Sequence, residues 1–208
     1  MSRKGTSTAR PERVMKHPSN RLIFDYWNMQ RGDRPAPDRS EIDPAAIRAA
    51  LSDTFIIAFN AQERHPFRLS GTRLCALFGG ELKGRAFIDL WDAPKQRVLL
   101  DLTRIVASES VGLVIGAVGW TSSDLSVELE ILLLPLTLRG KTHMRIMGAI
   151  APLNVPFWIG ATPVETLAIT GHRFLGPRHD RVPIPVVTIP EDVADIRRHL
   201  VVHDGGQR

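Results

Sequence analysis

Apolar side chains recur with a helical period near the start of the chain, between residues 20 and 31. They fall at i, i+4 and i+7, which predicts an amphipathic helix with Ser19 or Asn20 as N-cap and Gly32 as the stop. The apolar stripe of this helix is Leu22, Ile23, Tyr26, Trp27 and Met29. So large a stripe is unusual for a helix that faces water, and a helix this short is marginal alone. We therefore expect the helix to dock on another element.

The second half of the chain changes to the period of two that is typical of strands. Residues 125–136 alternate between apolar and polar in their first half, which predicts a strand with one buried face. The second half of that segment, residues 132–134, is apolar on both faces, so another element should cover its outer side. Further strands are predicted over residues 111–121, 144–151 and 165–174.

The first half contains shorter elements. Asp43 and Pro44 open a short helix, because Asp caps a helix and Pro suits its first position. After it, strands are predicted over residues 54–59 and 67–69, and helices over 72–78 and 93–107, with short helical pieces over 81–91. Two short strands, a group of helices and then long strands in a meander favour an α+β fold with an antiparallel sheet.

The composition is that of an ordinary globular chain. The 208 residues are 43% hydrophobic and 24% charged, and no stretch approaches the ~20 uninterrupted apolar residues of a membrane helix. A single cysteine argues against a disulfide scaffold, and residues 1–18 lack the apolar region of a secretory signal. We expect a cytoplasmic protein without membrane insertion. Its predicted parts are a disordered basic arm at 1–18, an N-terminal helical segment at 19–52, a core domain at 53–175 and a C-terminal extension at 176–208.

The net charge is +5, and much of the excess lies near the two ends of the chain. A basic surface is compatible with nucleic acid or an anionic membrane surface as partner. Because no nucleic-acid motif accompanies the charge, a solvated surface is the favoured interpretation, and a nucleic-acid-binding protein is kept only as an alternative.

Five short motifs occur in a fixed order along the chain. They are Leu22–Trp27 (LIFDYW), Arg39–Pro44 (RSEIDP), Arg68–Cys75 (RLSGTRLC), Leu77–Arg85 (LFGGELKGR) and Glu130–Leu136 (EILLLPL). In this order they resemble the PAS-domain family, and within it a branch of small stand-alone bacterial proteins, over about residues 20–175. The resemblance implies a five-stranded antiparallel sheet with helices on one face, interrupted after its second strand by three or four helices. It also implies a sensory or protein-interaction module with no attached catalytic domain.

The inward-facing positions of the predicted strands and of the longer helix are wholly apolar. They are Leu99, Leu102, Leu125, Val127, Leu129, Ile131, Met144, Ile146 and Ile150. Such a wall suits a packed core or a small apolar ligand, whereas an enzyme needs titratable groups that converge. We therefore expect a non-enzymatic signalling module, with a small enzyme that uses the same cavity as the alternative. No catalytic residue, metal site or cofactor is predicted, since the flavin-reactive cysteine motif and the haem-binding histidine of PAS relatives have no counterpart here.

Two arginines follow glycines in the motifs. Arg73 and Arg85 are candidates to clamp an anionic ligand by bidentate hydrogen bonds. The alternative is that each pairs with a neighbouring Asp or Glu, while Gly71 permits a sharp turn and Thr72 caps the following helix. The structural alternative is favoured.

Other candidate groups are assigned structural roles. Cys75 lies between apolar residues and is interpreted as core. Glu128 and Glu130 lie two apart on one strand face and are interpreted as facing solvent. His199 and His203 have the i, i+4 spacing of metal ligands, but no third ligand accompanies them, so they are interpreted as surface residues.

The expected partners follow from the N-terminal helix and from the family resemblance. The side chains of Leu132 and Leu134 are expected to point away from the predicted cavity. The N-terminal helix is therefore expected to cover the outer face of the sheet. It does so either within one chain or across a homodimer. The expected partner is thus a second copy of the chain or another signalling protein.

Overall fold

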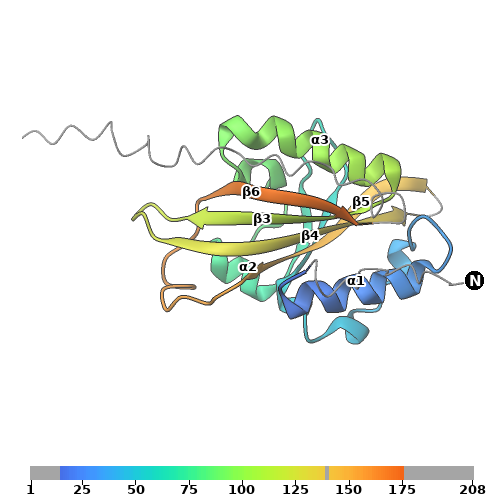
Figure 1. Ribbon diagram of the computed structural model, residues 1–208, viewed down its shortest axis with the longest axis horizontal. Helices are drawn as coiled ribbons and strands as arrows, with labels where there is room; N and C mark the ends of the chain where they lie inside the picture. The colour runs from blue at the N-terminus through green and yellow to red at the C-terminus, as the bar shows by residue number, and fades with distance from the viewer. Residues whose placement is uncertain (1–14, 139–140, 176–208) are drawn as a thin grey trace, which may run out of the picture.

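The computed structural model of the chain describes residues 15–138 and 141–175, and its centre is one antiparallel sheet (Figure 1). The strand order is β2-β1-β5-β4-β3-β6. The strands are β1 (Thr54–Ala58), β2 (Phe67–Ser70), β3 (Gly112–Trp120), β4 (Ser126–Leu138), β5 (Lys141–Pro152) and β6 (Thr166–Leu175). The predicted order of two short strands, helical segment and long meander is confirmed.

The sheet has six strands in the described residues, where the family resemblance implied five. The sixth strand, β6, pairs with β3 from Gly112↔Leu175 to Trp120↔Thr166, with a register shift between Gly116 and Ala117. The strand predicted over residues 165–174 is therefore part of the same sheet. It extends the sheet beyond β3, which would otherwise be the edge.

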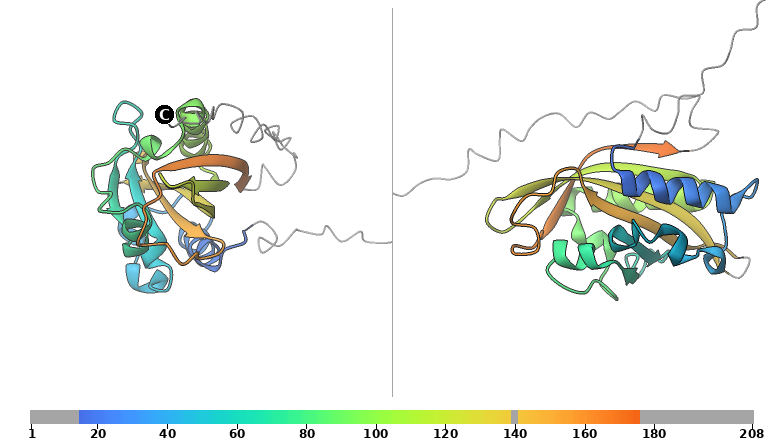
Figure 2. Two further views of the ribbon diagram at one scale, coloured as in Figure 1. Left: turned by 90° about the vertical axis from the view of Figure 1, so that its left-hand side faces the viewer. Right: turned by 90° about the horizontal axis from the view of Figure 1, so that it is seen from below.

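The helices are α1 (Pro18–Arg31), α2 (Thr72–Leu77) and α3 (Ala93–Glu109), with short 3₁₀ turns η2 (Arg39–Glu41), η3 (Pro44–Ile47), η4 (Leu51–Asp53) and η5 (Phe87–Leu90). α3 lies on one face of the sheet and α1 on the opposite face (Figures 1 and 2). This agrees with the expectation that the N-terminal helix covers the outer face, because the long strands are apolar on both faces and both faces need a cover.

Two apolar cores result. The larger one lies between the sheet and α3, and we call it the helix-side core; it includes Phe55, Phe67, Phe87, Trp91 and Leu99. The smaller outer core lies between the sheet and α1, with Trp27, Leu132, Leu134 and Met147 among its members. The prediction that the N-terminal helix covers Leu132 and Leu134 is confirmed, and the helix docks there within one chain.

The N-terminal boundary differs from the expected one. α1 begins at Pro18 and its N-cap is His17, whose side chain accepts a hydrogen bond from the Ser19 amide, so neither Ser19 nor Asn20 is the cap. Met15 is buried at 1% exposure although it belongs to the arm predicted to be disordered. Because α1 and the residues before it pack on the sheet, the segment 19–52 and the core domain form one unit.

At two other helix starts no side chain caps the helix. The N-cap of α2 is Gly71 rather than Thr72, and it makes no side-chain cap hydrogen bond. Asp92 is the N-cap of α3, also without a side-chain cap bond. Asp43 caps η3 as predicted, with its carboxylate accepting from the Ala45 amide. None of the helices in the described part of the chain is both long and apolar enough to span a bilayer.

Candidate functional site

A buried glutamate on the sheet holds the base of α1. Glu130 lies on the outer face of β4 and is only 4% exposed. Its carboxylate accepts hydrogen bonds from the backbone amides of Lys16 (2.6 Å) and His17 (2.8 Å) and from Asn20 Nδ2 (3.0 Å). The interpretation of Glu130 as solvent-facing is thus wrong, whereas Glu128 is exposed. Burying a charge is costly unless hydrogen bonds compensate it, and here donors from the start of α1 do so.

A second buried carboxylate lies beside the first turn of the same helix. Asp53, at the end of η4, is fully buried. Ser19 Oγ donates to its Oδ2 (2.7 Å), and Arg73 Nη1 donates to both of its oxygens (3.0 and 2.9 Å). Arg73 is therefore paired with an aspartate, as the structural alternative proposed. We call Glu130, Asp53 and the groups that donate to them the α1 clamp.

The electrostatics of the α1 clamp centre on His17. Burial lowers the pKa of His17, although the neighbouring carboxylates of Asp53 and Glu130 favour its charged form. Its Nδ1 accepts a hydrogen bond from the Ser19 amide (3.2 Å), a role open only to an unprotonated nitrogen. Asn20 Oδ1, buried beside Glu130, has no hydrogen-bond partner among the described residues. Movement of most groups in the α1 clamp would thus leave the buried carboxylate of Glu130 or Asp53 without a hydrogen-bond donor.

The predicted cavity wall lies in the helix-side core. Seven of its residues are buried there at 5% exposure or less, and Leu125 packs against them; the seven are Leu99, Leu102, Val127, Leu129, Ile131, Ile146 and Ile150. Met144 belongs to β5, but its side chain lies outside the described part of the structure. The eight described side chains thus lie in or against the helix-side core. Ligand binding by this wall stays a prediction.

Sequence reasoning missed a buried histidine at the rim of this core. His65, in the β1–β2 turn, is 1% exposed and stacks on Phe59 at 5.1 Å between ring centroids. Its Nδ1 accepts from the Asn60 amide (3.0 Å), so the proton is on Nε2, which donates to Thr103 Oγ1 in α3 (3.0 Å). Burial lowers the pKa of His65 to about 4. The turn appeared only polar in sequence, and no local signal marks this link to α3.

Two buried polar atoms near the start of α3 lack hydrogen-bond partners among the described residues. They are Trp91 Nε1 and Asp92 Oδ1. Trp91 belongs to the helix-side core and is 2% exposed. Burial raises the pKa of Asp92. At each of these atoms, a polar group of a bound molecule would gain a hydrogen bond.

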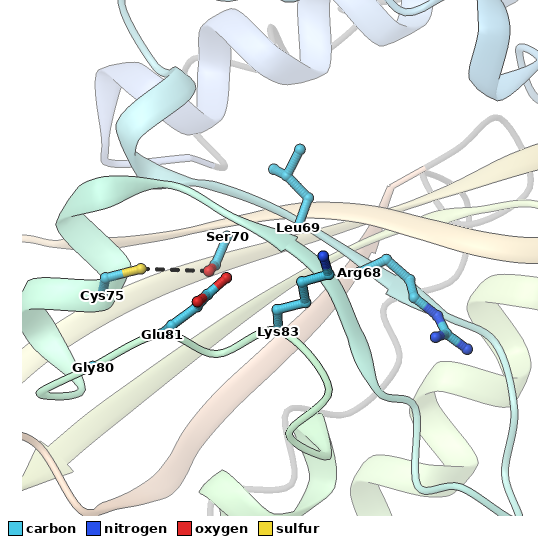
Figure 3. Close-up of a pocket in the computed structure, with 7 residues that line it drawn as sticks. All are labelled: Arg68, Leu69, Ser70, Cys75, Gly80, Glu81 and Lys83. Atoms are coloured by element: carbon cyan, nitrogen blue, oxygen red, sulfur yellow. Dashed lines mark hydrogen bonds between the residues drawn. The ribbon is translucent and has the colours of Figure 1, made fainter.

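A depression of about 430 Å³ lies beside the edge strand β2, and we call it the β2 hollow (Figure 3). Its lining residues are Arg68, Leu69, Ser70, Cys75, Gly80, Glu81 and Lys83. Cys75 is half-buried, with its Sγ 3.5 Å from Ser70 Oγ, so the interpretation of Cys75 as packed core is wrong. The cysteine lies on the face of α2 that turns toward the edge of the sheet.

The second arginine candidate has different neighbours from the first. Arg85 is exposed in the segment between α2 and η5, and its backbone carbonyl accepts from the Phe67 amide (2.9 Å). Its side chain makes no hydrogen bond or ion pair with any residue that the structure describes. Arg73 and Arg85 therefore do not form a common anion clamp.

A smaller depression, of about 280 Å³, lies beside the residues that precede α1. Lys16, Glu130, Gly116, Gly171 and Arg173 are among its lining residues. Gly116 and Gly171 pair across β3 and β6, and a Cβ on Gly116 would lie 2.8 Å from Thr170 Oγ1. Glu130 is already fully engaged by donors from the start of α1, which leaves the depression without a free acidic group.

Residues 15–138 and 141–175 contain no cluster of three or more His, Cys, Asp or Glu side chains that would hold a metal ion. The pair His199 and His203 lies outside the described residues.

Several arginines form ion pairs with acidic side chains: Arg34 with Glu41 at 2.9 Å, and Arg64 with Asp89 at 2.6 Å.

Comparisons with solved structures find distant likenesses. One is a light-oxygen-voltage domain from work on a flavin analogue, with 11% identity, TM-score 0.42, and 56% of this chain and 87% of that chain covered. Another is the blue-light photoreceptor Aureochrome1 LOV in its light state, with 13% identity, TM-score 0.41, and coverage of 56% and 91%. A third is the PAS domain of a protein from Colwellia psychrerythraea, with 13% identity, TM-score 0.38, and coverage of 53% and 97%. A search of curated proteins finds no match.

The comparison with protein families gives a direct assignment. The family model described as PAS domain matches residues 15–151, well over half of the chain. The match spans α1, the α1 clamp, the β2 hollow and the strands up to β5. It agrees with the order of elements in the structure and with the five sequence motifs. The chain belongs to the PAS domain family.

Proposed function

We propose that this chain is a non-enzymatic regulatory module that passes a signal to a partner protein by changing how α1 docks on the sheet. PAS domains are in general sensory signalling modules, and the family assignment supports that class of function. The observation that carries the proposal is the α1 clamp: the helix is fixed by two buried carboxylates, Glu130 and Asp53, in addition to apolar contact.

The α1 clamp is well suited to respond to changes in the sheet. Leu129 and Ile131 point into the helix-side core, while Glu130 between them points to the start of α1. A displacement of β4 caused by an event in the core therefore moves the carboxylate away from its donors. Loss of the donors to a buried carboxylate costs roughly 3–5 kcal/mol. The helix therefore has two states, one docked on the sheet and one undocked over its whole length. Two discrete states of this kind are what a switch requires.

A small apolar molecule is the input that we propose for the helix-side core. It would contact the predicted wall, and Trp91 Nε1 and Asp92 Oδ1 offer it an unpaired donor and acceptor. A protein partner that binds the outer face would act on α1 directly. Both inputs converge on the same helix.

The alternatives have less support in the described residues. The wall of the helix-side core holds apolar side chains, and the buried His65 uses both ring nitrogens in structural hydrogen bonds, so an enzyme has no convergent acid–base pair there. A nucleic-acid site needs unpaired basic side chains on one face. Arg34, Arg64 and Arg73 are bound to acidic neighbours and do not contribute to such a site.

Hydrogen exchange tests the proposal. The α1 amides of protein isolated with its bound partner or ligand are compared with those of the stripped chain, and we expect different protection. Glu130→Gln should speed α1 exchange in the stripped chain, because a neutral amide binds the donors less strongly. Glu128→Gln is the matched control, since Glu128 is exposed two residues away on the same strand face. Equal α1 protection in the bound and stripped states would contradict the proposal.

A further inference from the structure

The loop between β5 and β6 presents apolar side chains to water. Val155 is 75% exposed and Phe157 is 98% exposed, the highest values among the large hydrophobic residues that the structure describes. The next residue, Trp158, is buried at 6% and anchors the loop in the helix-side core. Phe157 thus projects from a fixed base, and we call residues 153–165 the Phe157 loop.

Backbone hydrogen bonds hold the Phe157 loop in shape. Its first residue, Leu153, donates to Glu128 O (2.9 Å), and Glu165 at its other end donates to Trp120 O (2.8 Å). Between them Val164 donates to Leu77 O (2.8 Å), which ties the loop to α2. A rigid loop loses little conformational freedom when an exposed aromatic side chain binds, and preorganised aromatic residues dominate many interfaces.

The surroundings of the Phe157 loop are acidic. Asp124, Glu128 and Glu165 lie in or beside the strands that carry the loop, and the segments 111–138 and 146–172 contain no Lys or Arg. A projecting apolar side chain with acidic residues around it is complementary to a depression that has an apolar floor and basic groups at its rim.

The β2 hollow has these properties. Cys75 and Gly80 contribute apolar surface, while Arg68 and Lys83 supply positive charge against the single acid Glu81; the Leu69 side chain points away from Cys75 and Glu81 (Figure 3). Its volume of about 430 Å³ exceeds the ~150 Å³ that accommodates a benzene ring. Lys83 forms no ion pair within the described residues, and Arg68 has only a long one to Glu63 (3.7 Å). The basic groups are therefore available to a partner.

The loop and the hollow lie on neighbouring parts of one surface. Pro163 packs against Gly79, where a Cβ would lie 2.7 Å from the proline Cβ, and Gly80 next to it lines the hollow. Figures 1 and 2 show the loop beside α2. A projection and a depression on the same surface can be exchanged by two copies around a two-fold axis.

We propose that two copies of this chain form a symmetric dimer in which the Phe157 loop of each copy inserts into the β2 hollow of the other. The occupant is a second copy because the chain itself supplies both complementary surfaces. This inference is independent of the proposed function, since neither surface belongs to the α1 clamp.

Cysteine cross-linking tests the contact, because Cys75 in the hollow is the only cysteine of the chain. In Val155→Cys, a short bis-maleimide should produce a covalent dimer in which peptide mapping finds Cys75 joined to the new residue 155 of the other copy. Val98→Cys is the matched control, since Val98 is 42% exposed on α3, away from the loop. The proposal would be overturned if the new cysteine of Val98→Cys joined Cys75 of the other copy in the same yield as the new cysteine of Val155→Cys.

Sedimentation equilibrium supplies the second measurement. The unmodified chain should dimerise, and Phe157→Ser should raise the dimer Kd by at least about tenfold without unfolding, because the side chain has almost no contacts within its own chain. Lys83→Glu should also weaken the dimer. A chain that stays monomeric at several hundred micromolar, or a dimer that Phe157→Ser leaves unchanged, would show that the proposal is wrong.

Discussion

Replacement of Trp27 by alanine tests the docking of α1 most sharply. Trp27 is 3% exposed in the outer core, and its Nε1 donates to Pro135 O (2.8 Å). Its ring stacks against Phe24, with centroids 6.2 Å apart. Loss of a buried Trp side chain costs about 3–5 kcal/mol, and the hydrogen bond accounts for roughly 1 kcal/mol of that. We therefore expect Trp27→Ala to lower the free energy of unfolding by about 3–5 kcal/mol, and Trp27→Phe by about 1–2 kcal/mol.

Urea unfolding followed by circular dichroism measures these values. With a slope of about 2 kcal/mol/M, the midpoint for Trp27→Ala should fall by roughly 1.5–2.5 M. Met29→Ala is the matched control, since Met29 lies on the same helix but is 68% exposed, and it should change stability by less than about 0.5 kcal/mol. Docking within one chain predicts the same Trp27→Ala loss at two protein concentrations tenfold apart. A loss no larger than that of Met29→Ala would refute the reasoning.

Three further predictions concern the sheet and its rim. The pKa of His65 is lowered to about 4, so the folded state prefers the neutral imidazole. The free energy of unfolding should therefore be highest above pH 6.5 and fall by up to about 3 kcal/mol as the pH drops to 4 and below. Urea unfolding at several pH values should show this decrease, and His65→Gln should abolish it. Arg73→Ala should cost about 1.5–3 kcal/mol because it leaves a buried carboxylate short of donors, whereas Arg85→Ala should cost almost nothing; equal thermal melts of the two variants would contradict the ion-pair role. Gly148→Ala should lower Tm, since a Cβ there overlaps the Leu132 carbonyl and the Phe55 ring, while Gly171→Ala has open space and should melt like the parent.

Much of the fold could be predicted because its signals are local. The period of two in β4 and the helical stripe of α1 each follow from a short stretch of sequence. The double-sided apolar run at Leu132–Leu134 even indicated that another element covers the sheet, and α1 does so. The sixth strand was visible as a segment, but its pairing with β3 depends on contacts some 50 residues apart and has no local signal.

The polar parts of the site could not be predicted in the same way. Glu130 alternates with apolar residues and therefore resembles a solvent-facing position, yet residues more than 100 positions earlier bury it. His65 is in a turn of polar residues, and only the placement of α3 shows that it is a structural link. Cys75 has apolar neighbours in sequence but lies at the edge of the sheet. In each case long-range packing, which sequence periodicity does not encode, decides the environment of the side chain.

Native mass spectrometry of the protein isolated from its natural source tests the central claim, that this PAS domain acts by binding rather than by catalysis. If the domain acts by binding, masses above that of one bare chain are expected: a partner protein, a second copy or a retained small molecule. Removal of the bound component should change hydrogen exchange in α1. Recovery of only the bare chain at every concentration, with no mass added, would contradict the account.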